Sequence, residues 1–206
     1  MKVPLRYQVT NYDCGPTSLL NGLSILFERE EIPPEVLRRI VACSIDWIGE
    51  DGTPGKRGTT HAAMAHLSAW LEDCGRAGWL DVSCRYLTGK DVTLAEGSSL
   101  RGAILRGGTA VAFIDLDGWH YILLTGVEED RVFAFDPWIL PEPFPVPDVK
   151  TDYDHPYLYN RVVPLERFES TDIHPYSFGP YEQREAVLLF NSSTLKPEDQ
   201  AVEYVI

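Results

Sequence analysis

The residue that most clearly could do chemistry in this chain is a cysteine, Cys14, in the stretch YQVTNYDCGPTSLLNGL. A helix-like pattern begins immediately after it, so the thiol lies at the predicted start of a helix and not inside one. The partial positive charge and unpaired N–H groups of a helix N-terminus favour the thiolate, which is the nucleophilic form of cysteine. Cys14 is therefore a candidate nucleophile. The other cysteines, Cys43, Cys74 and Cys84, are predicted to act as small hydrophobic residues.

A thiolate that attacks an amide needs a histidine to protonate the leaving group, and a third group to hold that histidine. Among five histidines, His120 differs because it opens a predicted strand directly after an Asp-Gly turn, in DGWHYILLTGV. The next predicted strand ends at Asp136. An antiparallel hairpin with its turn near residues 128–130 would bring Asp136 roughly opposite His120. Taken alone, each of these two residues is more often structural, but together they have the geometry of a general base and its orienter.

Attack on a carbonyl also creates an oxyanion, which needs hydrogen-bond donors. The backbone N–H of Cys14 could supply one, and the side-chain amide of Gln8, six residues earlier, could supply the other. A lone glutamine in a loop would otherwise be a solvated side chain. The sequence has no C-x-x-C pair, no His-x-x-x-His partner, no G-x-G-x-x-G and no P-loop pattern, so neither a metal nor a cofactor is expected.

The elements that must position these residues come in the order helices first, strands second. Helical spacing predicts three helices. The first begins near Cys14, and the second covers residues 34–43 with an inner face of Val36, Leu37, Ile40 and Val41. The third covers residues 60–75, with Gly75 as its C-cap. Apolar runs and alternation predict strands at 79–87, 109–116, 119–127, 132–138 and 185–191. This order predicts an α+β fold, with a helical layer packed on a mainly antiparallel sheet. A length of 206 residues without an evident linker predicts a single domain, 1–206.

One long segment does not follow these patterns. Residues 138–184 are rich in proline and tyrosine and show little periodicity. Because structureless loops of this length are uncommon in compact domains, we expect an insertion that covers the core or binds a ligand, and is not itself part of the core.

The composition excludes several classes of partner. The formal net charge is −13, which disfavours binding to nucleic acid or to an anionic membrane surface and weakly favours a basic substrate. No apolar run is long enough for a transmembrane helix, and the N-terminus lacks the apolar core of a signal peptide. The expected compartment is therefore the cytoplasm.

The combined motifs resemble the C39-type cysteine peptidases of the papain-like superfamily. The resemblance is carried by Gln8, by DCGPTSLL around Cys14, by GWHYILLTGV around His120 and by FAFDPW around Asp136, and it covers about residues 5–138. It implies a papain-like fold with Cys14 as nucleophile, His120 as general base and acid, Asp136 as orienter and Gln8 as oxyanion donor. Members of this family that cut after a double glycine are often fused to ABC transporters. This chain has no nucleotide-binding motif and resembles a stand-alone domain.

Three functions remain open at this point. The first is a cysteine peptidase that hydrolyses a peptide through an acyl-enzyme. The second is an acyltransferase, in which an amine intercepts the thioester of an acyl-carrying substrate. The third is a non-catalytic peptide-binding module. A sheltered acceptor pocket lined by Tyr153, Tyr157 and Tyr159 would favour transfer, and an open groove would favour hydrolysis.

Overall fold

A computed structural model describes residues 1–140, 144–197 and 200 of the chain. Its helices are α1 (Cys14–Leu26), α2 (Pro34–Ser44), α3 (His61–Arg76), η1 (Gly89–Asp91), α4 (Ser99–Leu105), α5 (Leu165–Glu169) and η2 (Tyr181–Gln183). Its strands are β1 (Val82–Thr88), β2 (Thr109–Asp115), β3 (Trp119–Glu128), β4 (Arg131–Phe135), β5 (Lys150–Thr151), β6 (Arg161–Pro164) and β7 (Glu185–Asn191). The three long helices precede all the strands, as the sequence predicts.

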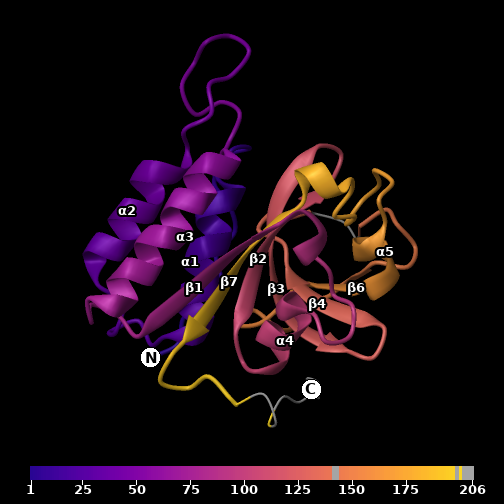
Figure 1. The fold of residues 1–206 in the computed structure, drawn as a ribbon. Coiled ribbons are helices and arrows are strands. Elements are labelled where there is room, and N and C mark those ends of the chain that lie inside the picture. The colour runs from indigo at the N-terminus through magenta and orange to yellow at the C-terminus, as the bar shows by residue number, and fades with distance from the viewer. Residues whose placement is uncertain (141–143, 198–199, 201–206) are drawn as a thin grey trace.

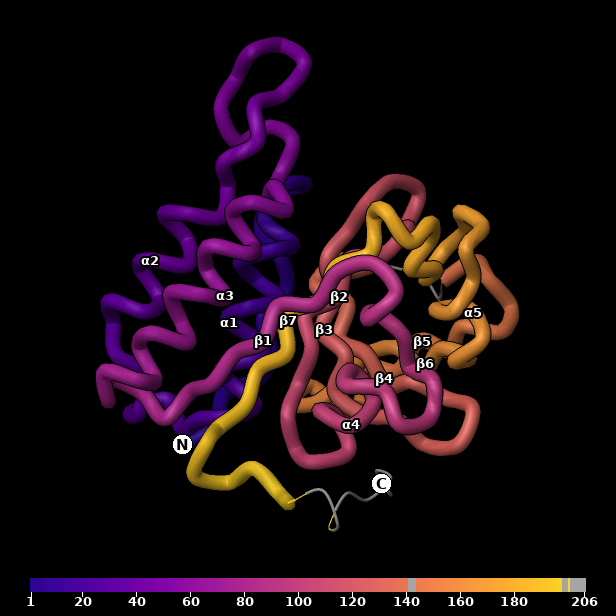
Figure 2. The backbone as a smooth tube through the Cα atoms, viewed as in Figure 1, coloured from indigo at the N-terminus to yellow at the C-terminus, as the bar shows by residue number. Residues whose placement is uncertain are grey.

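The strands found in the described residues form one seven-stranded sheet in the order β1-β7-β2-β3-β4-β6-β5. Every neighbouring pair is antiparallel. Although β7 comes last along the chain, it lies between β1 and β2 (Figure 2). The central strands β2 and β3 are buried over almost their whole length, so the positions of the residues at their ends are well fixed.

Two layers of hydrophobic core lie on the two faces of this sheet. Helices α1, α2 and α3 stand together on one side of the molecule (Figure 1), and their apolar side chains pack with Tyr121 and Leu123 of β3. The neighbouring β3 residues Ile122 and Leu124 point to the other face, where they pack with α4 and with residues of the segment after β4. The α+β fold, with a helical layer on an antiparallel sheet, is confirmed.

Helix α1 lies directly on the sheet and is buried along nearly its whole length. Gly22 permits this close approach, because a Cβ there would lie 2.6 Å from Cδ1 of Leu189 and 3.2 Å from Oγ1 of Thr109. The Ser18 hydroxyl donates a hydrogen bond to the Tyr121 carbonyl oxygen at 3.1 Å. These contacts fix the start of α1 relative to β3.

Helix α2 presents a narrower inner face than the sequence predicts. Val36 and Ile40 are fully buried and Leu37 is partly buried, but Val41 is 50% exposed. Because α2 is the outer helix of the layer, only one stripe of it contacts its neighbours, and the prediction that Val41 faces inward is wrong.

Helix α3 begins as predicted, with the Thr60 hydroxyl accepting a hydrogen bond from the Ala63 N–H at 3.1 Å. It ends at Arg76, so Gly75 lies inside the helix and is not its C-cap. The reason for glycine is a close approach of backbone: a Cβ on Gly75 would lie 1.8 Å from the carbonyl oxygen of Val82, where β1 begins. Gly75 therefore allows α3 to turn tightly into the sheet.

The segment 138–184 contributes to the core, and the prediction that it lies outside is wrong; residues 141–143 of it lie outside the described part of the chain. Strand β6 pairs with β4 and so extends the sheet. The side chains of Phe168, Tyr176 and Phe178 are fully buried in the second core. Its tyrosines and phenylalanines thus replace a regular helix as the cover of that face.

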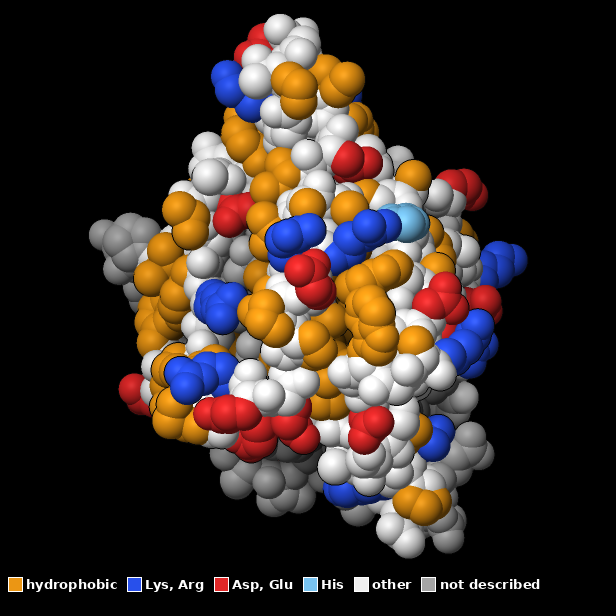
Figure 3. Space-filling view, turned by 90° about the vertical axis from the view of Figure 1, so that its left-hand side faces the viewer, with side chains coloured by type: hydrophobic (Ala, Val, Ile, Leu, Met, Phe, Trp, Pro, Cys, Tyr) orange, Lys and Arg blue, Asp and Glu red, His pale blue; other side chains and the backbone are white. Residues whose placement is uncertain are grey.

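The surface carries both signs of charge. On the α2 side, basic, acidic and hydrophobic side chains are interspersed and no broad basic patch appears (Figure 3). The loop between α2 and α3 projects from the body of the molecule (Figure 1) and carries Ile48, which is 59% exposed. Among the described residues, no helix is both long and apolar enough to span a bilayer.

Candidate active site

Cys14 is the first residue of α1 and is 8% exposed. The loop before it is held by Asp13, whose carboxylate accepts hydrogen bonds from the backbone N–H groups of Val9 and Thr10 at 3.0 and 2.7 Å. The residue after it must be small, because a Cβ on Gly15 would lie 2.4 Å from the Thr59 hydroxyl oxygen. The thiol is thus placed at a helix start between a tight loop and α3.

His120 is the second residue of β3 and is 9% exposed. It follows the predicted β2–β3 turn, in which Asp117 and Gly118 have φ angles of 56° and 124°. Aspartate and glycine tolerate such left-handed conformations, and this turn suits the twist of an antiparallel hairpin. The turn therefore sets where β3 begins and holds His120 at the N-terminal end of this central strand.

Asp136 follows β4 and is 1% exposed, and its Oδ1 lies 2.9 Å from His120 Nε2. A β-bulge makes this contact possible. The β3–β4 pairing slips by one residue at Thr125. If the pairing continued one residue beyond Leu123 and Phe135, Asp136 would lie beside Ile122. The Ile122 side chain is on the same face of the sheet as that of His120. Without the slip Asp136 would oppose Leu123 and project from the other face. With the slip Asp136 meets His120 diagonally, which agrees with the prediction that the two lie roughly opposite each other.

Three further groups hold the Asp136 carboxylate and backbone. The Tyr176 hydroxyl donates to Oδ2 at 2.8 Å, and the Trp138 backbone N–H donates to Oδ1 at 2.9 Å. Asn160 makes a pair of bonds with the Asp136 main chain: its Oδ1 accepts from the N–H and its Nδ2 donates to the carbonyl oxygen, both at 2.8 Å. The carboxylate is therefore fixed in one orientation toward His120.

The surroundings of the thiol and the imidazole favour the charged form of each. Burial alone would raise the pKa of Cys14, but the charge of His120, a hydrogen bond from its ring and the backbone N–H groups of Tyr121 and Gly15 bring that pKa below its usual value. Burial alone would lower the pKa of His120, but the negative charges of Asp136 and Cys14 raise it to about 10. Because Nε2 of His120 faces Asp136, Nδ1 is the ring nitrogen left for the thiolate.

The other charges of the cluster balance this pair. Burial disfavours the Asp136 carboxylate, but His120 and Arg161 lower its pKa below the usual value. Arg161 is fully buried, and its Nε donates to the Tyr176 hydroxyl oxygen at 3.2 Å. Burial and the Asp136 charge raise the pKa of Tyr176 well above its usual range, so this hydroxyl stays protonated and remains a donor. The site thus favours the charged forms of Cys14, His120, Asp136 and Arg161 together.

Gln8 lies on the same side of the site as His120. Its backbone N–H donates to the carbonyl oxygen of Pro137 at 3.0 Å, which ties the segment before α1 to the residues after Asp136. Its side-chain Nε2 donates to the Thr10 carbonyl oxygen at 2.7 Å and so keeps one N–H for another acceptor. Its Oε1 is buried and has no hydrogen-bond partner among the described residues.

A cavity of about 800 Å³ opens beside this site and is lined by Gln8, His120 and Trp138, among others. Tyr153, Tyr157 and Tyr159 do not line it: Tyr153 and Tyr157 are 43% and 50% exposed, and Tyr159 is buried against Phe133. The acceptor pocket anticipated around these tyrosines is therefore not the cavity at His120.

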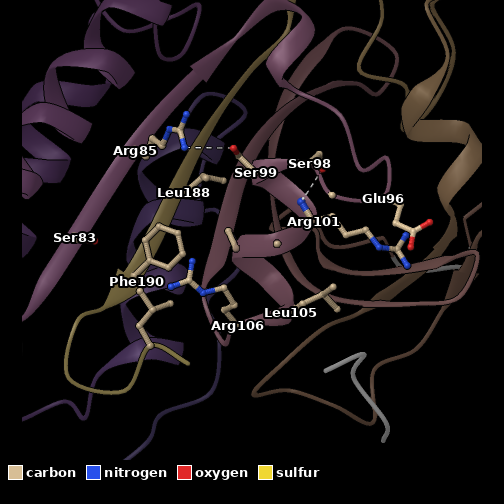
Figure 4. A pocket seen from close by; sticks show the side chains of 14 residues that line it. Ser83, Arg85, Glu96, Ser98, Ser99, Arg101, Leu105, Arg106, Leu188 and Phe190 are labelled. Carbon is tan, nitrogen blue, oxygen red and sulfur yellow. Dashed lines mark hydrogen bonds between the residues drawn. The ribbon is translucent and has the colours of Figure 1, made fainter. Parts of the chain in front are cut away.

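A second cavity, of about 810 Å³, lies over α4, and none of the four predicted site residues lines it. Three arginines surround it, Arg85, Arg101 and Arg106 (Figure 4). Arg85 donates to the Ser99 hydroxyl at 3.3 Å, and Nε of Arg106 donates to the Lys196 carbonyl oxygen at 2.7 Å. In the described part of the chain, no group of three or more His, Cys, Asp or Glu side chains could hold a metal ion.

The structure brings together Cys14, His120 and Asp136, and it places Gln8 beside them. Sequence reasoning missed Asn160, Arg161 and Tyr176. They belong to the aperiodic segment, where no motif marks them. The bulge did have a signal, because a glycine inside a strand pattern, here Gly126, is a known sign of one.

No protein-family model and no curated protein matches the sequence. Among solved structures, the chain is similar to the peptidase domain of Streptococcus mutans ComA, at 14% identity and a TM-score of 0.39, over 91% of this chain and 98% of that one. It is also similar to a double glycine motif protease from an AMS/PCAT transporter, solved in complex with the leader peptide, at 14% identity and a TM-score of 0.42, over 92% and 90% of the two chains. At this level of similarity, the function has to be inferred from the site itself.

Proposed function

We propose that this chain is a cysteine peptidase that hydrolyses a peptide amide bond through Cys14, His120 and Asp136. The observation that carries the proposal is the buried contact between these three side chains. The thiol at the start of a helix meets a histidine whose other nitrogen is 2.9 Å from a fully held carboxylate. The thiol and the imidazole each stabilise the charged form of the other, and this is the activation that a nucleophilic cysteine needs.

In the first half of the reaction, the Cys14 sulfur attacks the carbonyl carbon and a C–S bond forms. The negative charge moves to the carbonyl oxygen, where the backbone N–H of Cys14 and an N–H of Gln8 would stabilise it. The C–N bond then breaks as His120 gives its proton to the leaving nitrogen. The products of this step are a thioester on Cys14, a free amine and a neutral imidazole.

In the second half, water hydrolyses the thioester. The Cys14 charge contributes to the raised pKa of His120, and this contribution is lost once the sulfur is acylated. His120 is then a better base than donor, so it takes a proton from the attacking water while a C–O bond forms. The C–S bond breaks, the carboxylic product leaves, and the thiolate–imidazolium pair is restored. Asp136 stays charged throughout and keeps the ring in place.

Acyl transfer remains the second candidate, because the same thioester would serve both reactions. The cavity beside His120 gives an amine a place to bind where water would otherwise attack. Adding a large excess of a simple amine during turnover distinguishes acyl transfer from hydrolysis. A transferase yields amide product in proportion to the amine concentration, whereas a peptidase yields mainly the carboxylic acid. A binding module would yield neither. The net charge of −13 favours a basic substrate in either case.

We expect Cys14 to be the fastest-alkylated thiol of the native protein. Iodoacetamide labelling followed by mass spectrometry at pH 6 measures the rate for each cysteine. Burial raises the pKa of Cys74 and Cys84, so these thiols should react slowly. Cys43 is the internal control, since it is only partly buried, whereas Cys14 is buried. If Cys14 labels no faster than Cys43, the activated thiolate is ruled out.

The same pair sets the pH dependence of peptide cleavage. Activity should fall as the pH drops through the lowered pKa of Cys14, because the thiolate is lost. It should also fall as the pH rises through about 10, because His120 then has no proton for the leaving amine. An alkaline limb near the ordinary histidine value of 6.5 would contradict the ion pair.

A further inference from the structure

The cavity beside the site lies on the His120 side of the reacting atoms. His120 and Gln8 line it, whereas Cys14 does not. In the proposed reaction, His120 gives its proton to the leaving nitrogen, so the leaving group must lie on the His120 side of the attacked carbonyl carbon. The cavity therefore lies where the released fragment of the substrate would sit.

The walls of this cavity are largely apolar. Leu116 and Trp119 come from the β2–β3 hairpin, Trp138 follows Asp136, and Val146 and Ile173 come from the long segment after β4. A volume of about 800 Å³ is within the usual range for ligand pockets and exceeds what one small side chain fills. Such walls would discriminate strongly in favour of a large apolar group.

Two carboxylates also line the cavity, from Asp115 and Asp117. Asp115 is only 7% exposed, and its carboxylate has neither a hydrogen bond nor an ion pair within the described residues. A carboxylate at the wall of a cavity without a protein partner can gain a cationic partner from the substrate. The cavity thus combines apolar walls with a carboxylate that has no hydrogen-bond or ion-pair partner among the described residues.

We propose that this cavity selects the released side of the substrate: a large apolar residue directly after the scissile bond, followed by a basic residue. The inference rests on the proposed peptidase function and adds to it the part of the substrate that is recognised. It assigns specificity to the long segment after β4, which supplies one wall of the cavity.

The experiment uses the full chain and a peptide library made by digesting a cell extract. Mass spectrometry of the new N-termini shows which residue follows each cut. We expect enrichment of large apolar residues at the first position and of lysine or arginine at the second. For matched peptides that differ only at the first position, kcat/KM should be at least about tenfold higher for leucine or phenylalanine than for glycine.

Two variants connect this preference to the cavity. Ile173→Glu places a charge on the wall at a residue that is 60% exposed, so folding should be unaffected, and the preference for an apolar first residue should fall about tenfold. Ile139→Glu is the matched control, because Ile139 is 56% exposed and does not line the cavity. Asp117→Asn keeps a residue that tolerates the φ of 56° and removes the charge, so the preference for a basic second residue should fall about two- to fivefold at low salt.

The possible results separate this inference from the proposed function. Cleavage without any preference on the released side would overturn the inference and leave the peptidase intact, as would a preference that Ile173→Glu does not change. An absence of cleavage together with slow alkylation of Cys14 would overturn the peptidase and, with it, the inference.

Discussion

At the scale of single residues, the site depends on how firmly Asp136 is held. Its carboxylate has one oxygen for His120 and the other for Tyr176, and both partners are buried. Tyr176 itself adopts a φ of 67°, which is unusual for a bulky residue and has an energetic cost. Its aromatic contacts with Phe144 and Phe168 hold it in this conformation. The fold thus accepts local strain at the residue that orients the Asp136 carboxylate toward His120.

We expect Tyr176→Phe to lower kcat about tenfold or more with little change in KM. The substitution removes a hydrogen bond to a charged group, worth about 1.5–3 kcal/mol, and a tenfold change in rate corresponds to about 1.4 kcal/mol. Steady-state peptide cleavage measures it. Tyr153→Phe is the control, since its hydroxyl donates to the Leu140 carbonyl oxygen at 2.9 Å and the residue is 43% exposed. A kcat within twofold of the parent would show that Tyr176 does not position Asp136.

The residues predictable from sequence are those with a local signature. Cys14 precedes a helix pattern, His120 follows an Asp-Gly turn, and Asp136 precedes a proline. Asn160 and Tyr176 could not be predicted because they reach Asp136 from 24 and 40 positions away, out of a segment without periodicity. Their role depends on tertiary contacts, which no local pattern encodes.

At the scale of elements, close packing between α3 and β1 depends on one glycine. Helix and strand periodicity predicted both elements, and the end of α3 was misplaced because a glycine near a helix end normally indicates a C-cap. Here Gly75 serves a close contact with the Val82 backbone instead. The distinction could be made only once the following strand was placed in space.

Gly75→Ala should lower the free energy of unfolding by at least about 2 kcal/mol, because its Cβ would lie 1.8 Å from a backbone oxygen that cannot rotate away. Urea denaturation monitored by tryptophan fluorescence measures this change. Gly102→Ala is the matched control: it is also a helical glycine, but a Cβ there meets nothing within 4 Å. Its higher helix propensity should stabilise the protein by up to about 1 kcal/mol. Equal effects of the two substitutions would contradict the close approach.

At the scale of the whole molecule, β7 holds the two halves of the sheet together. It pairs with β1 on one side and with β2 on the other. The sequence predicted β7 as a strand but not its position, because strand order depends on which apolar faces meet. Antiparallel strands far apart in sequence leave several possible orders until the core is assembled.

A chain that ends at residue 184 should therefore not fold, whereas one that ends at residue 197 should. The shorter chain lacks β7 and leaves β1 and β2 without their shared partner. Circular dichroism during thermal unfolding, together with the Cys14 alkylation rate, distinguishes the two. A cooperative transition and rapid labelling in the shorter chain would show that the sheet does not need β7.

This strand order also affects the timing of activity during synthesis. Cys14 leaves the ribosome early, but the residues that fix Asp136 emerge much later, and the strand that completes the sheet emerges later still. Domains generally fold as units as they are synthesised. A nascent chain would therefore carry a thiol without its oriented histidine until nearly all of the domain has been translated. If the proposed peptidase function holds, this order keeps the chain inactive toward itself and toward neighbouring nascent proteins until the domain is complete.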